Sequence, residues 1–171
     1  MKTLIIQGSS RSDGNTGRIA EMLNEEINCP LMDLKNKTIG PYDYEYNNQD
    51  DDFLPLIREV VQYDLIIFIT PVYWYTMSGL MKTFFDRISD CIRVEKELGR
   101  KLRGKSMAAV ACGSGPEEVD CFFMPFKKSA DYLGMNYLGD LHTWVENNNP
   151  PESVQKSIKN FADELVHSRV N

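Results

Sequence analysis

The sequence Asp64-Leu65-Ile66-Ile67-Phe68-Ile69-Thr70 decides the fold, because it places five consecutive apolar side chains between polar neighbours. An uninterrupted apolar run of this length, rich in β-branched residues, is typical of a strand covered on both faces in a parallel sheet. Pro71 comes next and is expected to stop the strand. Two further runs of the same kind cover Thr3 to Gln7 and Met107 to Cys112.

Stretches with apolar residues at helical spacing separate these runs. They begin near Thr16, Leu54, Leu80 and Val154, and Pro125 suits the first turn of one more helix. Weaker strands fit Leu31 to Leu34 and Asn136 to Leu141, and a long loop is expected from Gly113 to Phe123. Strands alternating with helices predict an α/β fold: a three-layer, doubly wound sandwich around a five-stranded parallel sheet of order 2-1-3-4-5.

The position of a ligand site follows from this topology. Ligands of doubly wound sheets bind beyond the carboxyl ends of the strands, where the winding reverses, which is here between the first and third strands. The loops that begin at Gly8, Pro71 and Gly113 are therefore the candidate binding loops.

Length and composition fit a single domain over residues 1–171, with 42% apolar and 26% charged residues. The formal net charge of −6 argues against nucleic-acid binding and gives no reason to expect a membrane surface as partner. No apolar run approaches the roughly 18 residues that span a bilayer. Leu4-Ile5-Ile6 is too short for the core of a signal peptide, so a cytoplasmic location is expected.

The cysteines and histidines offer no metal or acid–base motif. Cys29, Cys91, Cys112 and Cys121 form no CxxC pair and are expected to be reduced, buried or half-buried, without a zinc or iron–sulfur site. His142 and His167 are each too isolated in the sequence to suggest an acid–base pair. Each is interpreted as a surface or helix-end residue.

The first candidate loop reads Gly8-Ser9-Ser10-Arg11-Ser12-Asp13-Gly14-Asn15-Thr16 and matches neither the P-loop nor the GxGxxG pattern. Ahead of a helix N-terminus, which attracts anions, it supplies the hydroxyls of Ser9, Ser10, Ser12 and Thr16 and the guanidinium of Arg11. These groups favour a compact phosphomonoester. The alternative is a polar loop in which Asn15 or Thr16 only caps the helix.

The second candidate loop carries three adjacent aromatic residues, Tyr73, Trp74 and Tyr75. Exposed aromatic surface of this size is unusual unless something covers it, so at least one ring is expected to be free for a ligand or another subunit. The alternative is that Trp74 packs under a neighbouring loop or in a dimer contact.

The third candidate loop begins with Gly113-Ser114-Gly115. Because glycine has no Cβ and accepts positive φ, this backbone can approach a ligand closely. A tight turn without a ligand is the alternative.

Two of these loops resemble a known family. Pro71-Val72-Tyr73-Trp74, with Gly79-Leu80-Met81-Lys82-Thr83-Phe84-Phe85-Asp86-Arg87, resembles the central motif of NADPH-dependent FMN reductases and related NAD(P)H:quinone reductases. Gly8 to Arg11 with Gly14 to Thr16 resembles their phosphate loop, and Leu133 to Gly139 is similar to their approach to the fifth strand. The resemblance covers nearly the whole chain and implies a flavodoxin-like fold.

The resemblance also implies bound FMN. It assigns Ser9, Arg11, Asn15 and Thr16 to the phosphate and Pro71, Val72, Tyr73 and Trp74 to the isoalloxazine ring. It favours a contact between the Gly113–Gly115 backbone and the ring, where fixed N–H dipoles would stabilise the reduced form. Lys82, Asp86 and Arg87 are implied to be structural.

Two features depart from the family pattern. Ile39 to Tyr46 contains none of the cysteines that related iron–sulfur flavoproteins carry there, which argues against a cluster. Ser78-Gly79 stands where many relatives have Pro-Ala or similar small residues.

The implied activity is transfer of electrons from NADH or NADPH through FMN to a small acceptor such as a quinone, flavin, nitro compound or azo compound. Because the cofactor carries the reaction, no catalytic side chain is named. The family implies a homodimer or higher homo-oligomer, and the Tyr42–Asp52 loop could edge the site from a partner subunit. The alternative function is a flavodoxin-type electron carrier without its own substrate. The basic stretch Arg93–Lys105 is interpreted as a solvated connection or, alternatively, a contact for the 2′-phosphate of NADPH.

Overall fold

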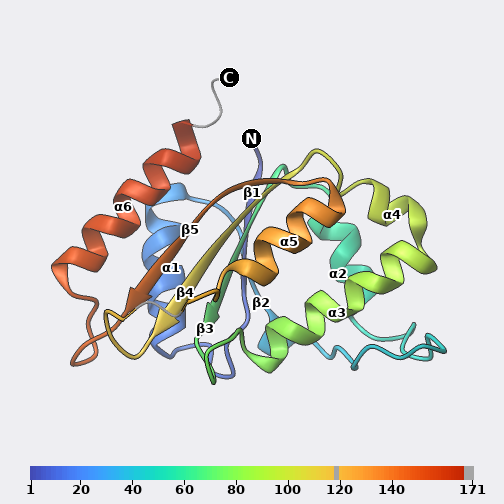
Figure 1. Ribbon diagram of the computed structural model, residues 1–171, viewed down its shortest axis with the longest axis horizontal. Helices are drawn as coiled ribbons and strands as arrows, with labels where there is room; N and C mark the ends of the chain where they lie inside the picture. The colour runs from blue at the N-terminus through green and yellow to red at the C-terminus, as the bar shows by residue number, and fades with distance from the viewer. Residues whose placement is uncertain (118–119, 168–171) are drawn as a thin grey trace.

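The strands form one parallel sheet in a computed structural model, which describes residues 1–117 and 120–167 (Figure 1). They are β1 (Thr3–Gln7), β2 (Leu31–Asp33), β3 (Leu65–Pro71), β4 (Ser106–Gly113) and β5 (Asn136–Trp144). Their order across the sheet is β2-β1-β3-β4-β5, which confirms the predicted topology. Each residue of β1 and β3 is buried, as the uninterrupted apolar runs require.

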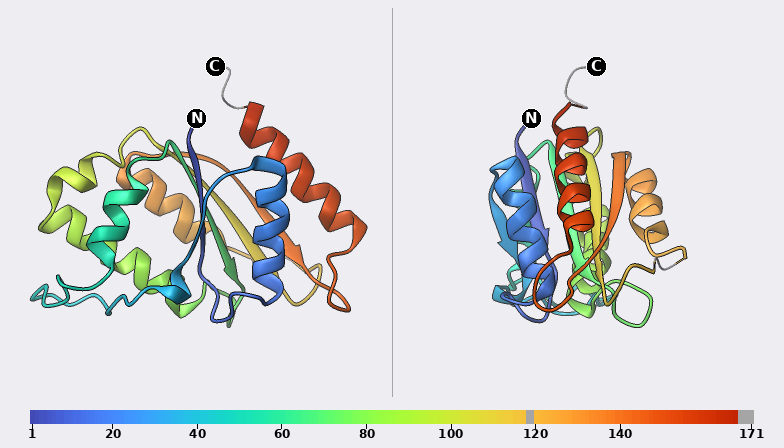
Figure 2. Two further views of the ribbon diagram at one scale, coloured as in Figure 1. Left: turned by 180° about the vertical axis from the view of Figure 1, so that it is seen from behind. Right: turned by 90° about the vertical axis from the view of Figure 1, so that its left-hand side faces the viewer.

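Helices cover both faces of the sheet (Figure 2). Apolar residues of α1 (Asn15–Ile27) and α6 (Glu152–His167) pack on one face. Those of α2 (Phe53–Val60), α3 (Gly79–Arg93), α4 (Lys96–Arg100) and α5 (Met124–Leu133) pack on the other. A short 3₁₀ helix, η1 (Leu34–Asn36), follows β2. The three layers of the predicted sandwich are therefore present.

Several element ends differ from the sequence-based expectation. Pro71 belongs to β3 instead of stopping it, because pairing with β4 continues through Pro71 and the Val72 N–H donates to the Cys112 carbonyl at 2.9 Å. The second strand ends at Asp33, whose carboxylate accepts from the Lys35 N–H and caps η1. The fifth strand runs on to Trp144, and the basic connection contains α4, whose Leu98 is buried.

A buried arginine anchors the long connection before α2. The Arg87 side chain on α3 is 1% exposed. It donates to the Asp90 carboxylate at 2.8 Å from Nε, to the Gly40 carbonyl at 3.1 Å from Nη1 and to the Asn48 carbonyl at 2.7 Å from Nη2. It also pairs with Asp51. The family-implied structural role of Arg87 is therefore seen as a direct contact with residues 40–51.

The electrostatics of this anchor favour an ionised Asp51. Burial alone would raise the pKa of Asp51, but hydrogen bonds from Arg87 and from the Phe53 and Gly40 N–H groups outweigh burial. The pKa of Asp51 is therefore held below its ordinary value.

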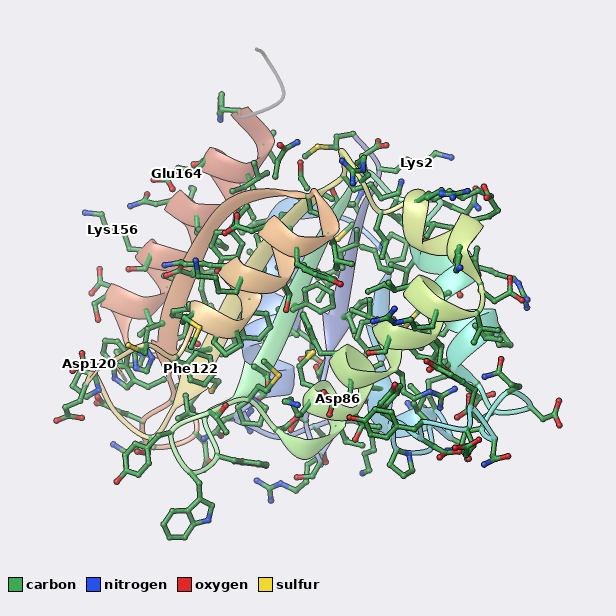
Figure 3. The ribbon with its side chains drawn as sticks, turned by 45° about the vertical axis from the view of Figure 1, so that its right-hand side comes forward. Lys2, Asp86, Asp120, Phe122, Lys156 and Glu164 are labelled. Atoms are coloured by element: carbon green, nitrogen blue, oxygen red, sulfur yellow. The ribbon has the colours of Figure 1, made fainter. Side chains whose placement is uncertain are left out.

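The carboxyl ends of the strands point to one edge of the molecule, where the loops after β1, β3 and β4 meet (Figure 1). Asp120 lies at this edge, while Lys2 lies at the opposite end (Figure 3). In the described part of the chain no helix has the length and apolar character needed to cross a membrane.

Candidate functional site

The first loop is held in place by contacts with the strand and helix that it joins. Ser9 is buried, and its hydroxyl accepts from the Arg11 N–H at 3.3 Å. The Gln7 side chain donates to the Ser12 carbonyl at 3.2 Å. The same carbonyl oxygen would lie 2.0 Å from a Cβ at residue 17, so only Gly17 lets the loop close onto the first turn of α1.

The N-terminus of α1 adjoins this loop, and within the described residues its first backbone N–H groups have no hydrogen-bond acceptor. Gly14 occupies the cap position, and no side chain in the described residues caps the helix. The N–H groups of a first helical turn have no partner within the helix and attract anions. Arg11 folds back over this point, with its guanidinium Nε 3.5 Å from the site of a Cβ at Gly14. Among the described residues Arg11 has no carboxylate partner. This donor set fits the phosphate of FMN.

Thr16 occupies a different position from the exposed residues of the loop. It is buried at the start of α1 and acts on the thiol of Cys112, which lies near the end of β4. Burial raises the pKa of the Cys112 thiol, and the bonds with Thr16 and Thr143 act in the opposite direction. Thr16 therefore joins the first loop to the strand that leads into the third.

The second loop folds into a tight turn that displays its aromatic rings. The Tyr73 N–H donates to the Thr76 carbonyl at 2.9 Å, and the Thr76 N–H donates back to the Tyr73 carbonyl at 3.1 Å. Trp74 and Tyr75 between them have φ of 47° and 66°, as in a type I′ turn. Their side chains are 92% and 75% exposed, so Trp74 is not packed under a neighbouring loop.

Ser78 ties this loop to the first loop. Its hydroxyl accepts from the Met81 N–H at 3.1 Å, which caps α3, and donates to the Gly8 carbonyl. Its own N–H donates to the Thr70 hydroxyl at 3.0 Å. The departure from the family pattern at this position thus provides a helix cap and a bond between loops.

A second bond joins the exposed parts of these loops. The hydroxyls of Ser10 and Tyr73 lie 2.9 Å apart, within hydrogen-bond distance. The phosphate-type loop and the aromatic loop therefore meet at one edge of the sheet, as the switch-point argument predicts.

A cavity of about 710 Å³ lies beside the aromatic turn. Its lining comes from the second and third loops and from β5: Val72, Trp74, Tyr75, Gly113, Ser114, Glu117, Asp120 and His142. A wide opening flanked by exposed aromatic rings and by a glycine-containing backbone fits a planar ring such as isoalloxazine.

The predicted site residues divide between the two parts of this edge. Val72, Trp74, Gly113 and Ser114 line the cavity together. Ser9, Ser10, Arg11, Ser12, Asn15 and Thr16 form the adjacent loop and helix start. Tyr73 links the two parts through Ser10, whereas Pro71 is buried at the end of β3. Gly115 contributes its carbonyl oxygen to a bond with His142 at 3.0 Å.

His142 is the site residue that sequence reasoning missed. It was expected at the surface or a helix end, but it is half-buried on β5 and lines the cavity. The predicted fifth strand ended at Leu141, three residues before the observed end at Trp144, so nothing connected His142 with the ligand edge. A longer strand in the sequence reading would have placed it there. His167 does lie at a helix end, in the last turn of α6.

The cysteines are all free. Cys91 and Cys112 are buried and Cys29 is half-buried, as expected, but Cys121 is exposed because it lies in a surface turn with φ of 63°. Burial raises the pKa of the Cys91 thiol to about 12, which makes it unreactive. Within the described residues no three His, Cys, Asp or Glu side chains gather as a metal site.

A family model described as NADPH-dependent FMN reductase matches residues 1–149 of the chain. A Bacillus subtilis protein named provisionally as an NAD(P)H-dependent FMN-containing oxidoreductase is 28% identical over 165 residues, covering 91% of this chain and 90% of that protein.

Solved structures share the fold. An FMN-dependent NADH-azoreductase from Bacillus anthracis, in complex with FMN, superposes with a TM-score of 0.71 at 13% identity, over 99% of each chain. The general stress protein 14 of Treponema denticola, also in complex with FMN, gives a TM-score of 0.66 at 17% identity, covering 98% of this chain and 97% of that one.

Proposed function

We propose a function from the premise that this chain belongs to the NADPH-dependent FMN reductase family. It is an FMN-dependent NAD(P)H oxidoreductase. We propose that its acceptor is a small planar molecule of the quinone or azo class, and that the whole chain acts as one domain in a cytoplasmic homo-oligomer. The observation that carries the proposal is the cavity beside the exposed Trp74–Tyr75 turn, adjoining an uncapped helix N-terminus.

The first loop binds the phosphate of FMN in this proposal. The free N–H groups at the start of α1 donate to the phosphate oxygens, with the exposed Ser10 hydroxyl and the Arg11 guanidinium beside them. The buried hydroxyl of Ser9 shapes the loop through the Arg11 N–H. Ser12 fixes the loop from the other side through its carbonyl bond with Gln7. Asn15 and Thr16, in the first turn of α1, are the remaining residues of the proposed phosphate site.

The second and third loops hold the flavin ring. Val72 and Trp74 would supply apolar and aromatic surface to the ring, and the backbone of Gly113 and Ser114 would contact it. FMN held there would supply the hydride-accepting chemistry. The protein orients the nicotinamide and then the acceptor against the exposed aromatic turn, and no side chain is required as a nucleophile.

The test uses the purified protein in two steps. FMN is first titrated by isothermal calorimetry, and saturable binding with one FMN per chain is expected. NADH and NADPH are then mixed separately with the FMN-loaded protein in a stopped-flow instrument. Loss of the flavin absorption band near about 450 nm, followed by its return when a quinone or azo dye is added, supports the proposal.

A matched pair of variants separates the contribution of the first loop to FMN binding from that of the cavity. Ser10→Ala/Arg11→Ala should weaken binding of FMN more than binding of riboflavin, which has no phosphate. Trp74→Ala should weaken both ligands to a similar extent. A protein that binds FMN but is not bleached by either nicotinamide would instead be an electron carrier of the flavodoxin type.

A further inference from the structure

We propose that His142 is a positioning residue that fixes the Gly113–Gly115 backbone and thereby sets the affinity and the reduction potential of bound FMN. This inference rests on the proposed flavin site but concerns a residue outside the family motifs quoted above. His142 lies on β5, two residues from the end of the strand, and lines the cavity.

The bond between His142 and the third loop has a defined direction. The imidazole Nε2 lies 3.0 Å from the Gly115 carbonyl oxygen. A carbonyl oxygen can only accept, so His142 must carry a proton on Nε2 and donate it. This bond therefore fixes the tautomer of the ring and holds a flexible glycine residue by its carbonyl group.

The ring also fills the space beside the first glycine of the loop. A Cβ at Gly113 would lie 2.7 Å from His142 Cε1 and 3.2 Å from Nε2, closer than side-chain carbons pack. The imidazole therefore occupies the space beside Gly113 and bonds to the Gly115 carbonyl. Both glycine positions of the predicted flavin-contacting loop are set by one side chain.

The side chain of Trp144 in turn packs against His142. The imidazole ring stacks on Trp144, with centroids 6.1 Å apart and planes inclined by 28°. The indole Nε1 of Trp144 in turn donates to the Glu146 carboxylate at 2.8 Å. Packing and hydrogen bonds of this kind limit the rotation of a side chain, so the imidazole is held ready to position the loop.

The expected consequence is electrostatic. Reduction of FMN places negative charge on the ring, and correctly oriented backbone N–H dipoles stabilise that charge without reorganisation. When the loop is released, binding of reduced FMN should weaken more than binding of oxidised FMN. The midpoint potential should then become more negative.

The test compares His142→Gln with His142→Asn, with His167→Gln as the control. The amide nitrogen of glutamine can occupy the place of Nε2, whereas the amide of asparagine reaches only to the place of Nδ1. His142→Asn should weaken oxidised FMN binding about three- to tenfold, the range of one lost hydrogen bond. His142→Gln should stay within about twofold of the wild type, as should His167→Gln in the last turn of α6, which does not line the cavity.

The readouts are the dissociation constant of FMN from fluorescence titration and the midpoint potential from spectroelectrochemistry. A more negative potential in His142→Asn, restored in His142→Gln, supports the positioning role. Equal values in all variants, or equal losses in the asparagine and glutamine variants, would overturn it. If the wild type itself fails to bind FMN, the proposed function is wrong instead.

A second pair of variants covers the case in which His142→Asn folds poorly. Gly113→Ala should destabilise the protein because the new methyl group meets the imidazole. Adding His142→Ala should remove that clash, so the double variant should be more stable than Gly113→Ala alone by urea unfolding. A purely additive double variant would show that His142 does not hold this loop.

Discussion

The turns Tyr73–Thr76 and Glu146–Asn149 follow the carboxyl ends of β3 and β5. Their φ angles and closing hydrogen bonds are nearly the same. Each is closed by a reciprocal pair of hydrogen bonds, of 2.9 and 3.1 Å in the first and 2.9 and 2.8 Å in the second. The central residues have φ of 47° and 66° in the first turn and 47° and 67° in the second. The first turn holds Trp74 and Tyr75 at these positions, and the second holds Asn147 and Asn148.

The two turns differ in how well their central residues suit this backbone. Asparagine tolerates the left-handed region, so the second turn has residues that suit its backbone. Left-handed backbone costs other L-residues about 1–2 kcal/mol each, and the first turn accepts this cost at two large aromatic residues that remain exposed. Strain of this kind persists where function requires the side chains. The comparison therefore marks the Trp74–Tyr75 pair as the candidate functional surface.

The largest expected effect concerns Arg87, whose buried ion pairs lie outside both turns. Arg87→Met should lower the free energy of unfolding by about 3–5 kcal/mol, because Asp51 and Asp90 lose the partner that compensates their burial. Urea unfolding measures this loss. Lys82→Met is the matched control on the same helix: its exposed pair with Asp86 is worth at most about 1 kcal/mol. Similar losses in both variants would contradict the anchoring role of Arg87.

Moving the aromatic pair into the second turn should reproduce the strain. Asn147→Trp/Asn148→Tyr should lower the free energy of unfolding by about 1–3 kcal/mol, because both residues must adopt positive φ without a compensating contact. Thermal and urea unfolding measure the change. An unchanged free energy of unfolding would mean that Trp-Tyr costs no more than Asn-Asn in this turn.

The reverse exchange should relieve the strain. Trp74→Asn/Tyr75→Gly should raise the free energy of unfolding of the FMN-free protein by about 1 kcal/mol, because the pair then matches a type I′ turn. Asn148→Gly is the control in the second turn, where the change should stay within about 0.5 kcal/mol. A less stable exchange variant would show that the aromatic rings stabilise the FMN-free turn.

The smallest expected effect is that of acidification, which should leave the stability difference between the wild type and Trp74→Asn/Tyr75→Gly almost unchanged. The pKa of Asp51 is lowered in the folded state, so its stabilisation is complete above the ordinary aspartate pKa of about 3.9 and is lost as the pH falls through the lowered value. The wild type and Trp74→Asn/Tyr75→Gly should lose stability together below about pH 4, since neither exchange adds a group that titrates there. A stability difference that depends on pH between 7 and 4 would contradict local strain.

The fold and the positions of the candidate loops could be predicted from the sequence because each depends on local patterns. The apolar run 65–69 identifies the central strand, and the polar loop before Thr16 indicates the proposed anion site, because both signals are local in the sequence. The burial of Arg87 could not be read, because it depends on how residues 40–51 fold back across α3.

The geometry of the aromatic turn and the place of His142 in the cavity could also not be predicted from the sequence. Trp-Tyr carries no signal for a type I′ turn, whereas Asn-Gly pairs do. The fifth strand is only half-buried at a sheet edge, so its apolar pattern fades before His142 although pairing with β4 continues to Trp144. Tertiary pairing, and not local preference, extends this strand into the site.

The most direct test of the account is the stability of the wild type and of Trp74→Asn/Tyr75→Gly, each measured with and without saturating FMN. Without FMN the exchange variant should be more stable by about 1 kcal/mol. With FMN the order should reverse, because loss of the aromatic contacts should weaken FMN binding about thirtyfold, or about 2 kcal/mol. An exchange variant that keeps the same advantage in both conditions would contradict the claim that this strained turn is retained to hold the flavin.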